Sequence, residues 1–280
     1  MLLILTASCN LPFAAEATLT PEAPAATDTT ESPTEGVIAT SDPTESVDRT
    51  LEAIVLLQPG PLSAITSPVT VAGQSRPTFE QNLVVAVYDQ EGNEIALQPT
   101  TIAADAGSPG PYSIAISFSV ASEQPGRVSV YETSALDGGI VHLASVEVTL
   151  NPGGPASIQP AALGFESIDI QSPIAITELG SGTVVVSGFS DYYFESNLGL
   201  MLCGGGGSGA QHDLCGTEDN ILFAGNAMID SPDLGLPGPF SGQITLSVSE
   251  STPGRIVVFA ASPRDGGLMH VSSIPVLLVP

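Results

Sequence analysis

The feature that most constrains this fold is a phrase that occurs twice. The stretch PGPYSIAISFSV begins at Pro109, and PGPFSGQITLSV begins at Pro237. Three further matches keep the same offset: Gly126-Arg127 with Gly254-Arg255, Asp137-Gly138-Gly139 with Asp265-Gly266-Gly267, and His142 with His270. In a chain of 280 residues, which is long enough for about two domains, this pattern predicts a tandem duplication.

An insertion distinguishes the second copy from the first. Matches earlier in each copy, such as Gly73 with Gly188, have a shorter offset than those that follow. The extra residues of the second copy therefore lie between the earlier and the later matches, around CGGGGSGAQHDLCG. We therefore predict a first domain over residues 52–152, a Pro/Gly-rich linker over 153–164 and a second domain over 165–280.

Each copy shows the two-residue period of half-buried strands. Tyr112, Ile114 and Ile116 alternate with small polar residues, and Phe240, Ile244 and Leu246 repeat this phase in the second copy. Gly-rich turns such as Asp-Gly-Gly separate the runs, and no segment has a helical apolar stripe. Short strands at this spacing predict an all-β protein with two antiparallel β-sandwiches.

The motifs of both copies resemble a known family. SPVTVAG, FEQN, PGPYSIAISFSV, PGRVSVYETSALDGG in the first copy and FESN, PGPFSGQITLSV, PGRIVVFAAS in the second are similar to those of Gmad2 domains. These are immunoglobulin-like domains associated with bacterial spore germination. The resemblance implies extracytoplasmic, non-catalytic modules that often belong to lipoproteins, and it implies no catalytic residues.

The N-terminus predicts a lipid anchor and a tether. MLLILTASC resembles the lipobox of bacterial lipoproteins over residues 1–9, with Cys9 as the acylated residue, although Thr6 stands where an aliphatic residue is usual. Residues 10–51 are rich in Thr, Pro and acidic residues, which favours a disordered stalk. We expect an extracytoplasmic lipoprotein that contacts the membrane through its N-terminal lipid.

The charge of the chain argues against nucleic acid as a partner. There are 30 acidic residues against 5 basic ones, and the formal net charge is −25. Nucleic-acid binding needs clustered Lys and Arg, so we expect no nucleic-acid partner. The partner in the envelope, whether protein or glycan, is not specified by the sequence.

Two cysteines flank the insertion and leave three interpretations. Cys203 and Cys215 form a disulfide, or they join His212 in a metal site with Asp213 nearby, or they remain free thiols. In an oxidising compartment the disulfide is favoured, because no C-x-x-C pair organises a metal site here. We therefore predict a disulfide and no metal.

Other candidate residues are few. Tyr192, Tyr193, His212 and Asp213 are the candidate ligand-binding residues, and Asp213, Glu218 and Asp219 could bind calcium but lack EF-hand spacing. His142 and His270 have no neighbouring Ser, Cys or His that would suggest a nucleophile and base, so we place them on hairpin arms. Arg127 and Arg255 are expected to make ion pairs or turn contacts.

The sequence predicts a non-catalytic function. No nucleophile elbow, zinc-protease motif or phosphate loop is present, and we expect neither catalytic residues nor a cofactor. We expect immunoglobulin-like modules for adhesion or envelope interaction, with a link to germination suggested by the family resemblance. The alternative is a glycan-binding or ligand-sensing domain that uses Tyr192, Tyr193 and the insertion.

Overall fold

The computed structural model describes residues 49–280, and the expected lipid at Cys9 lies outside them, as does all but the end of the predicted stalk. The all-β prediction is confirmed. Strands dominate the described residues, whose helical elements are three short 3₁₀ turns. No helix in these residues has the length and apolar character needed to cross a bilayer.

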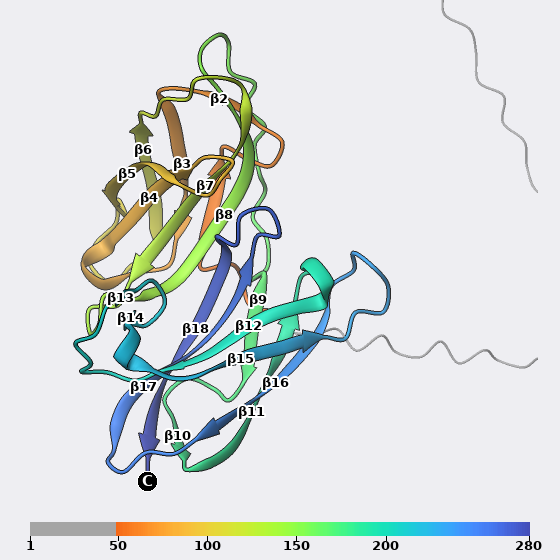
Figure 1. Ribbon diagram of the computed structural model, residues 1–280. Helices are drawn as coiled ribbons and strands as arrows, with labels where there is room; N and C mark the ends of the chain where they lie inside the picture. Colours follow the sequence, from red (N-terminus) through yellow and green to blue (C-terminus); the bar gives the residue numbers. More distant parts are fainter. Residues whose placement is uncertain (1–48) are drawn as a thin grey trace, which may run out of the picture. The chain divides into compact units, whose positions relative to one another are not determined.

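The N-terminal half, residues 54–151, packs two sheets around one core (Figure 1). Its strands are β1 (Ile54–Gln58), β2 (Ala64–Thr66), β3 (Val69–Ser75), β4 (Asn82–Tyr88), β5 (Glu94–Thr101), β6 (Gly110–Ile116), β7 (Gln124–Thr133) and β8 (Ile140–Asn151). One sheet has the order β1-β3-β6, and the other begins β5-β4-β7-β8, with β2 parallel to β8. The buried alternation of β6, with Tyr112 and Ile116 inward, follows the predicted period.

The C-terminal half, residues 168–279, has its own core. Its strands are β9 (Ile168–Ser172), β10 (Thr177–Gly180), β11 (Gly182–Ser190), β12 (Asn197–Cys203), β13 (Gln211–His212), β14 (Gly216–Thr217), β15 (Ile221–Ile229), β16 (Gly238–Leu246), β17 (Thr252–Ala261) and β18 (Leu268–Val279). The long β15 pairs with β12 along its length and with β16 near its end, so it joins the two layers of this half. Strand β10 runs parallel to β18, as β2 does to β8.

The repeated Pro-Gly-Pro-aromatic phrase has a packing explanation. Tyr112 in β6 lies directly opposite Gly73 in β3, and Phe240 lies opposite Gly188. A Cβ on Gly73 would overlap both the Val55 carbonyl and the Tyr112 ring. The aromatic ring therefore crosses the sheet over a glycine, and the Tyr112 hydroxyl donates a hydrogen bond to the Val55 carbonyl at 3.0 Å.

The FEQN and FESN motifs form matching tight turns before β4 and β12. The 3₁₀ turns η1 (Phe79–Gln81) and η2 (Phe194–Ser196) both contain left-handed residues, with φ of 54° at Glu80 and 55° at Glu195. The Gln81 amide donates to the carbonyls of Asp105 and Ser108 at 3.0 and 2.9 Å, which fixes the loop between β5 and β6. These motifs therefore organise the fold.

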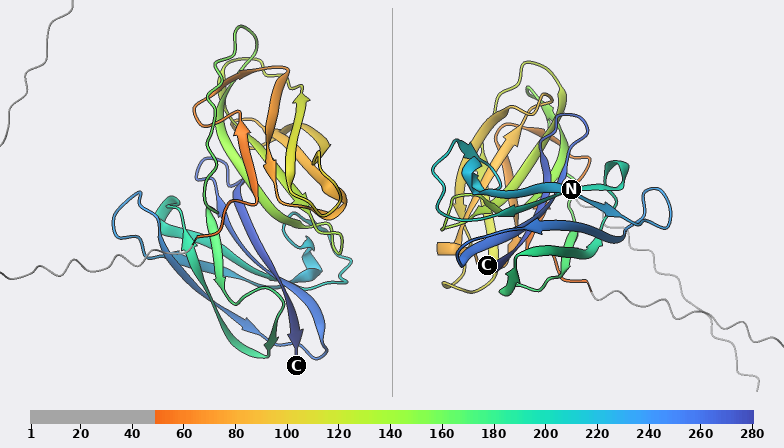
Figure 2. Two further views of the ribbon diagram at one scale, coloured as in Figure 1. Left: turned by 180° about the vertical axis from the view of Figure 1, so that it is seen from behind. Right: turned by 60° about the horizontal axis from the view of Figure 1, so that its bottom comes forward.

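Strands β8 and β18 join the two halves into one sheet (Figures 1 and 2). They pair antiparallel through Leu143 opposite Val271 and Ala144 opposite His270. Leu143 and Val271 each follow one of the matched histidines, so they occupy equivalent positions in the repeat pattern. A buried cluster that includes Leu143, Met201, Val257 and Val271 fills the space beside this pairing. The residues before β1 and β9 also meet, through a bridge between Leu51 and Phe165.

Candidate functional site

Four titratable side chains meet where β8 pairs with β18. They are Glu52 and His142 from the N-terminal part of the chain and Glu166 and His270 from the C-terminal part, and we call them the Glu–His cluster. One donor atom from each lies within 4.8 Å of the others. Three of the residues are buried, and the Glu52 side chain is only 11% exposed.

Two β-bulges position the histidines. In the β7–β8 pairing the register shifts between His142 and Ile140, so Val141 is the extra residue. In the β17–β18 pairing it shifts between His270 and Leu268, so Met269 is the extra residue. A bulge re-aims the next side chain and frees backbone groups.

The freed carbonyls at the bulges are used across the junction. The Ser273 hydroxyl donates to the Val141 carbonyl at 2.7 Å, and the Ser145 hydroxyl donates to the Met269 carbonyl at 2.6 Å. Each bulge is therefore held by the opposite strand. Both histidine rings face the same space, with ring centroids 5.2 Å apart and planes nearly perpendicular.

The glutamates are fixed by their backbone neighbours. The Glu52 amide donates to the Gly164 carbonyl at 3.1 Å, and the Glu166 amide donates to the Thr50 carbonyl at 2.8 Å. Each carboxylate uses its Oε2 to accept a backbone N–H from the other segment: Ser167 for Glu52 at 3.3 Å, and Ala53 for Glu166 at 3.1 Å. The Oε1 atoms are thereby directed toward the histidines.

The charges of the cluster are tightly coupled. His142 Nε2 lies 2.7 Å from Glu52 Oε1, and His270 Nε2 lies 2.9 Å from Glu166 Oε1. Burial alone would raise the pKa of Glu52, but the charge of His270 and the hydrogen bond and charge of His142 bring that pKa to about 2. Burial would lower the pKa of His270, but the facing carboxylates of Glu52 and Glu166 outweigh it and raise that pKa.

Two small cavities border the cluster. One of about 270 Å³ is lined by His142, Glu166 and the stem of Arg76, among others. The other, of about 240 Å³, is lined by Glu52, His270 and Tyr193. Arg76 also lies 3.4 Å from Glu166 Oε2 and is about half exposed. Small solutes can thus approach the buried side chains from two directions.

Two arginine–aspartate pairs flank the junction on equivalent residues. Arg127 from β7 pairs with Asp265 at 3.1 Å, and both side chains are 1% exposed. Arg255 from β17 lies 3.6 Å from Asp137 and donates to the carbonyls of Ile140 and Leu214 at 2.7 and 2.6 Å. In the first pair the N-terminal half supplies the arginine and the C-terminal half the aspartate. In the second pair the two halves supply the opposite residues, at the matching positions of the repeated motifs. The ion-pair prediction for both arginines is confirmed.

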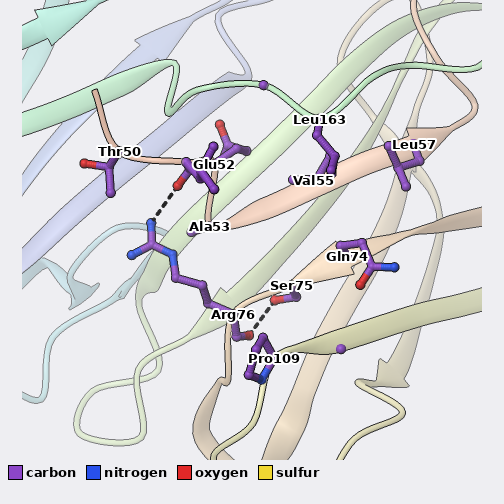
Figure 3. A pocket seen from close by; sticks show the side chains of 13 residues that line it. Thr50, Glu52, Ala53, Val55, Leu57, Gln74, Ser75, Arg76, Pro109 and Leu163 are labelled. Carbon is purple, nitrogen blue, oxygen red and sulfur yellow. Dashed lines mark hydrogen bonds between the residues drawn. The ribbon is translucent and has the colours of Figure 1, made fainter. Parts of the chain in front are cut away.

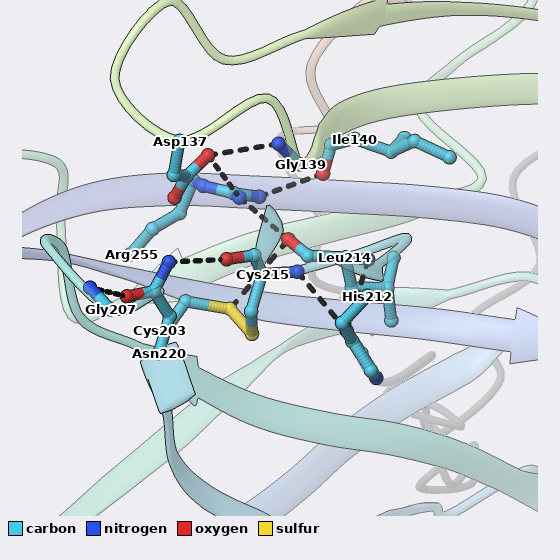
Figure 4. The surroundings of a disulfide bond; sticks show 10 residues. All are labelled: Asp137, Gly139, Ile140, Cys203, Gly207, His212, Leu214, Cys215, Asn220 and Arg255. Atoms are coloured by element: carbon cyan, nitrogen blue, oxygen red, sulfur yellow. Dashed lines mark hydrogen bonds and ion pairs between the residues drawn. A yellow bond between two sulfur atoms is a disulfide. The ribbon is translucent and has the colours of Figure 1, made fainter. Parts of the chain in front are cut away.

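The insertion is a disulfide-closed loop that packs against the N-terminal half (Figure 4). Cys203 and Cys215 are bonded, which confirms the disulfide and excludes the metal site built on their thiolates. The Asp213 carbonyl accepts the Ile140 amide at 2.7 Å, and His212 Nδ1 accepts the backbone amides of Leu214 and Cys215. Asp213, Glu218 and Asp219 do not form a metal-binding group among the described residues.

The two candidate tyrosines lie just before η2. Tyr193 packs partly against the core of the C-terminal half, and burial raises its pKa. Tyr192 is half-buried, and Phe194 nearby is 59% exposed. Tyr193 borders the cavity next to Glu52 and His270, so the structure places it beside the cluster. Ligand binding by these residues stays a prediction.

An apolar groove of about 800 Å³ lies beside β1 (Figure 3). Leu51, Val55, Leu57, Pro109 and Leu163 supply apolar walls. Two of its polar residues make internal hydrogen bonds: the Arg76 guanidinium donates to the Leu51 carbonyl at 3.3 Å, and the Ser75 hydroxyl donates to the Arg76 carbonyl at 2.8 Å. The linker reaches this groove through Leu163 and Gly164.

The sequence does not predict the Glu–His cluster. The matched histidines are visible in it, but local reasoning places them on two separate hairpin arms. Glu52 and Glu166 lie ahead of the matched motifs in each copy, so they carry little signal. The available clue is that the repeated histidines, arginines and aspartates all lie beside turns. This pattern is compatible with turns of the two copies that face each other at one junction.

Comparison with known families gives one match. Residues 53–139 match Gmad2, the immunoglobulin-like domain of bacterial spore germination. This segment runs from the start of β1 to the turn before β8 and is less than half of the chain. The immunoglobulin-like expectation is confirmed for it, and the search of curated proteins finds no match.

Two similar solved structures are distant from this chain in sequence. A chimeric titin Z1Z2-Z1Z2 tandem carrying a fibronectin GRGDS peptide is 13% identical, with 81% of this chain and 98% of that chain covered and a TM-score of 0.21. Dimeric latent PorU from Porphyromonas gingivalis is also 13% identical, with coverage of 82% and 24% and a TM-score of 0.24. This chain thus spans about a quarter of PorU.

Proposed function

We propose that this protein is a non-catalytic lipoprotein outside the cytoplasm, which presents immunoglobulin-like modules to the cell envelope and takes part in germination. The observation that carries the proposal is the Gmad2 match over residues 53–139. The Cys203–Cys215 disulfide supports it, because such bonds persist in oxidising compartments. The N-terminal pattern ending at Cys9 supplies the proposed membrane attachment, and the acidic Thr/Pro-rich segment supplies the tether.

The modules are proposed to act by contact with a protein or a polysaccharide of the envelope. Ser75 and Arg76, which line the groove beside β1, are held in internal hydrogen bonds, which suits a scaffold. The tandem duplication inferred from the sequence would give two related modules on one anchor.

The test is to follow the native chain and its Cys9→Ser variant in the producing cell. We expect the native chain in the membrane fraction, with incorporation of a labelled fatty acid, and the variant in the soluble or secreted fraction without label. A native chain in the cytoplasm with free thiols at Cys203 and Cys215 would contradict the proposal. Failure of a mutant lacking this protein to germinate normally would support the germination role, and normal germination would argue against it.

A further inference from the structure

We propose that the Glu–His cluster is a binding site for one divalent transition-metal ion, with zinc as the favoured metal. The ion would take Oε1 of Glu52, Nε2 of His142, Oε1 of Glu166 and Nε2 of His270. One donor atom from each residue already lies within 4.8 Å of the others. The site would join both halves of the fold, since each half supplies one glutamate and one histidine.

The spacing of the donor atoms suits a small ion. A tetrahedral zinc site with bonds of about 2.0–2.2 Å has neighbouring ligand atoms about 3.3 Å apart. Three donor pairs in the cluster are 2.7, 2.9 and 3.6 Å apart. The remaining pairs lie within 4.8 Å, so the donors must draw together by up to about 1 Å to form a coordination shell. Such shifts need only side-chain rotation, because all four donors sit at the ends of side chains.

The charge balance favours a divalent cation. Two carboxylates share a buried site with two imidazoles. A metal ion binds neutral imidazoles, so its binding displaces any proton from the histidines and leaves the four ligands with a charge of −2. An uncompensated buried charge is costly, and metal coordination is one of the ways in which proteins neutralise it. Of the two carboxylates, only that of Glu166 pairs with Arg76, whose side chain is about half exposed. A bound dication would neutralise both carboxylates together.

The outer contacts are those of a prepared metal site. Carboxylate ligands in metalloproteins are themselves held by hydrogen bonds, which fix the ligand atom. Here Glu52 and Glu166 each use Oε2 for a backbone amide, and each directs Oε1 at a histidine. Oε1 of Glu52 also accepts a long hydrogen bond of 3.5 Å from the Ile54 amide. The imidazoles are positioned through the backbone instead, because the hydroxyls of Ser145 and Ser273 bind the bulge carbonyls of Met269 and Val141.

The ligand types identify the metal class and the role. Imidazole nitrogens suit zinc and other transition metals, whereas calcium and magnesium prefer oxygen ligands. Four protein ligands with no open position are typical of a structural zinc site. The cavities of about 270 and 240 Å³ on either side give an ion a route to the buried donors.

The test measures metal content and coordination in the full-length chain. Cys9 is replaced by Ser in every sample and reductant is omitted, so no free thiol competes for the metal. After chelation and dialysis the chain is titrated with Zn²⁺, and bound metal is measured by mass spectrometry. We expect one Zn²⁺ per chain, and a Co²⁺-loaded sample should show the intense visible absorption of four-coordinate cobalt.

Variants distinguish this site from adventitious binding. His142→Gln and His270→Gln should each raise the Zn²⁺ dissociation constant about 100-fold or more. The matched control is His212→Gln, which changes the third histidine of the chain and should keep the stoichiometry of one. A circular dichroism spectrum like that of the unsubstituted chain establishes that each variant is folded.

Two outcomes would overturn the proposal. One is a folded, unsubstituted chain that binds no stoichiometric Zn²⁺, in which case the cluster is held by protons alone. The other is loss of binding in His212→Gln with retention in both cluster variants. The Co²⁺ spectrum needs no variant, so the proposal stays testable even if the substitutions unfold the protein.

Discussion

At the scale of single residues, the flanking ion pairs matter because they are almost fully buried. Arg127 and Asp265 are 1% exposed, whereas Arg255 has two backbone carbonyls in addition to Asp137. Removing one partner of a buried pair leaves an uncompensated charge. The two arginines occupy matching positions, but Arg127 depends more on its aspartate than Arg255 does.

We expect Asp265→Asn to lower the free energy of unfolding by about 3–5 kcal/mol. Asp137→Asn should cost about 1–2 kcal/mol, because Arg255 keeps its carbonyl acceptors. The exposed control Glu147→Gln, which faces Arg264, should change it by less than about 1 kcal/mol. Urea unfolding measures all three, and equal losses for Asp265→Asn and Glu147→Gln would refute this order.

The same aspartate gives the fold an acid dependence. Burial would raise the pKa of Asp265, but the Gly267 amide, the hydrogen bond and charge of Arg127 and the hydrogen bond from Arg264 lower it from 3.8 to about 2. Between these values the unfolded chain binds more protons than the folded chain, so stability rises with pH. The contribution is complete above about pH 4 and is lost as pH falls toward 2.

This acid dependence can be measured as a difference. The gap between the unfolding free energies of the unsubstituted chain and of Asp265→Asn should narrow, without closing, as pH falls from about 4 to 2. Using the difference removes the effect of other carboxylates, which are common to both proteins. A gap that stays constant through this window would show that the Asp265 pKa is not lowered by folding.

At the scale of elements, the disulfide loop is a brace between β12 and the turn that precedes β8. Its closure spans 12 residues of sequence, and its contacts extend to Ile140 and, through Arg255, to Asp137. The flanking cysteines are enough to predict the bond from the sequence. They do not predict that the loop packs against the other half, because the side on which a glycine-rich loop folds is set by tertiary contacts.

Replacing both Cys203 and Cys215 by Ser should lower the free energy of unfolding by about 3 kcal/mol, because the unfolded chain is no longer restricted by a cross-link that closes a loop of this length. Chemical denaturation of the variant and the oxidised parent measures the loss. The Cys9→Ser variant is the control, because Cys9 lies outside the described fold and its replacement should leave the midpoint unchanged. Equal stability of the oxidised and double-serine proteins would contradict the bracing role.

The strands themselves are predictable, because their side chains alternate in a way that needs only local information. Tyr112 and Ile116 point inward as their period requires. The bulges at Val141 and Met269 are not predictable, since neither extra residue is a glycine or a proline. These bulges turn His142 and His270 toward each other, so the candidate site depends on the part of the structure that the sequence specifies least directly.

At the scale of the whole described fold, equivalent residues meet in reciprocal contacts. Leu143 pairs with Val271 at the centre, and both side chains are at most 2% exposed. Interfaces between domains of one chain allow relative motion unless they are large and apolar. Here a continuous sheet, a shared apolar cluster and two ion pairs couple the halves.

We therefore expect one cooperative transition in calorimetry of the unsubstituted protein. Leu143→Asp places a charge in the shared apolar cluster and should separate unfolding into two transitions, one for each half. The control is Leu97→Asp on β5, because this leucine is 49% exposed and lies away from the junction. Two transitions in the unsubstituted protein, or one in Leu143→Asp with a native-like spectrum, would contradict this coupling.

The reciprocal contacts also bear on how the junction responds to dilution. An isologous contact between separate molecules forms only when their concentration exceeds the dissociation constant. Here a short linker joins the two faces, so each experiences the other at an effective concentration on the order of mM. A protein present in few copies per cell would keep this contact intact.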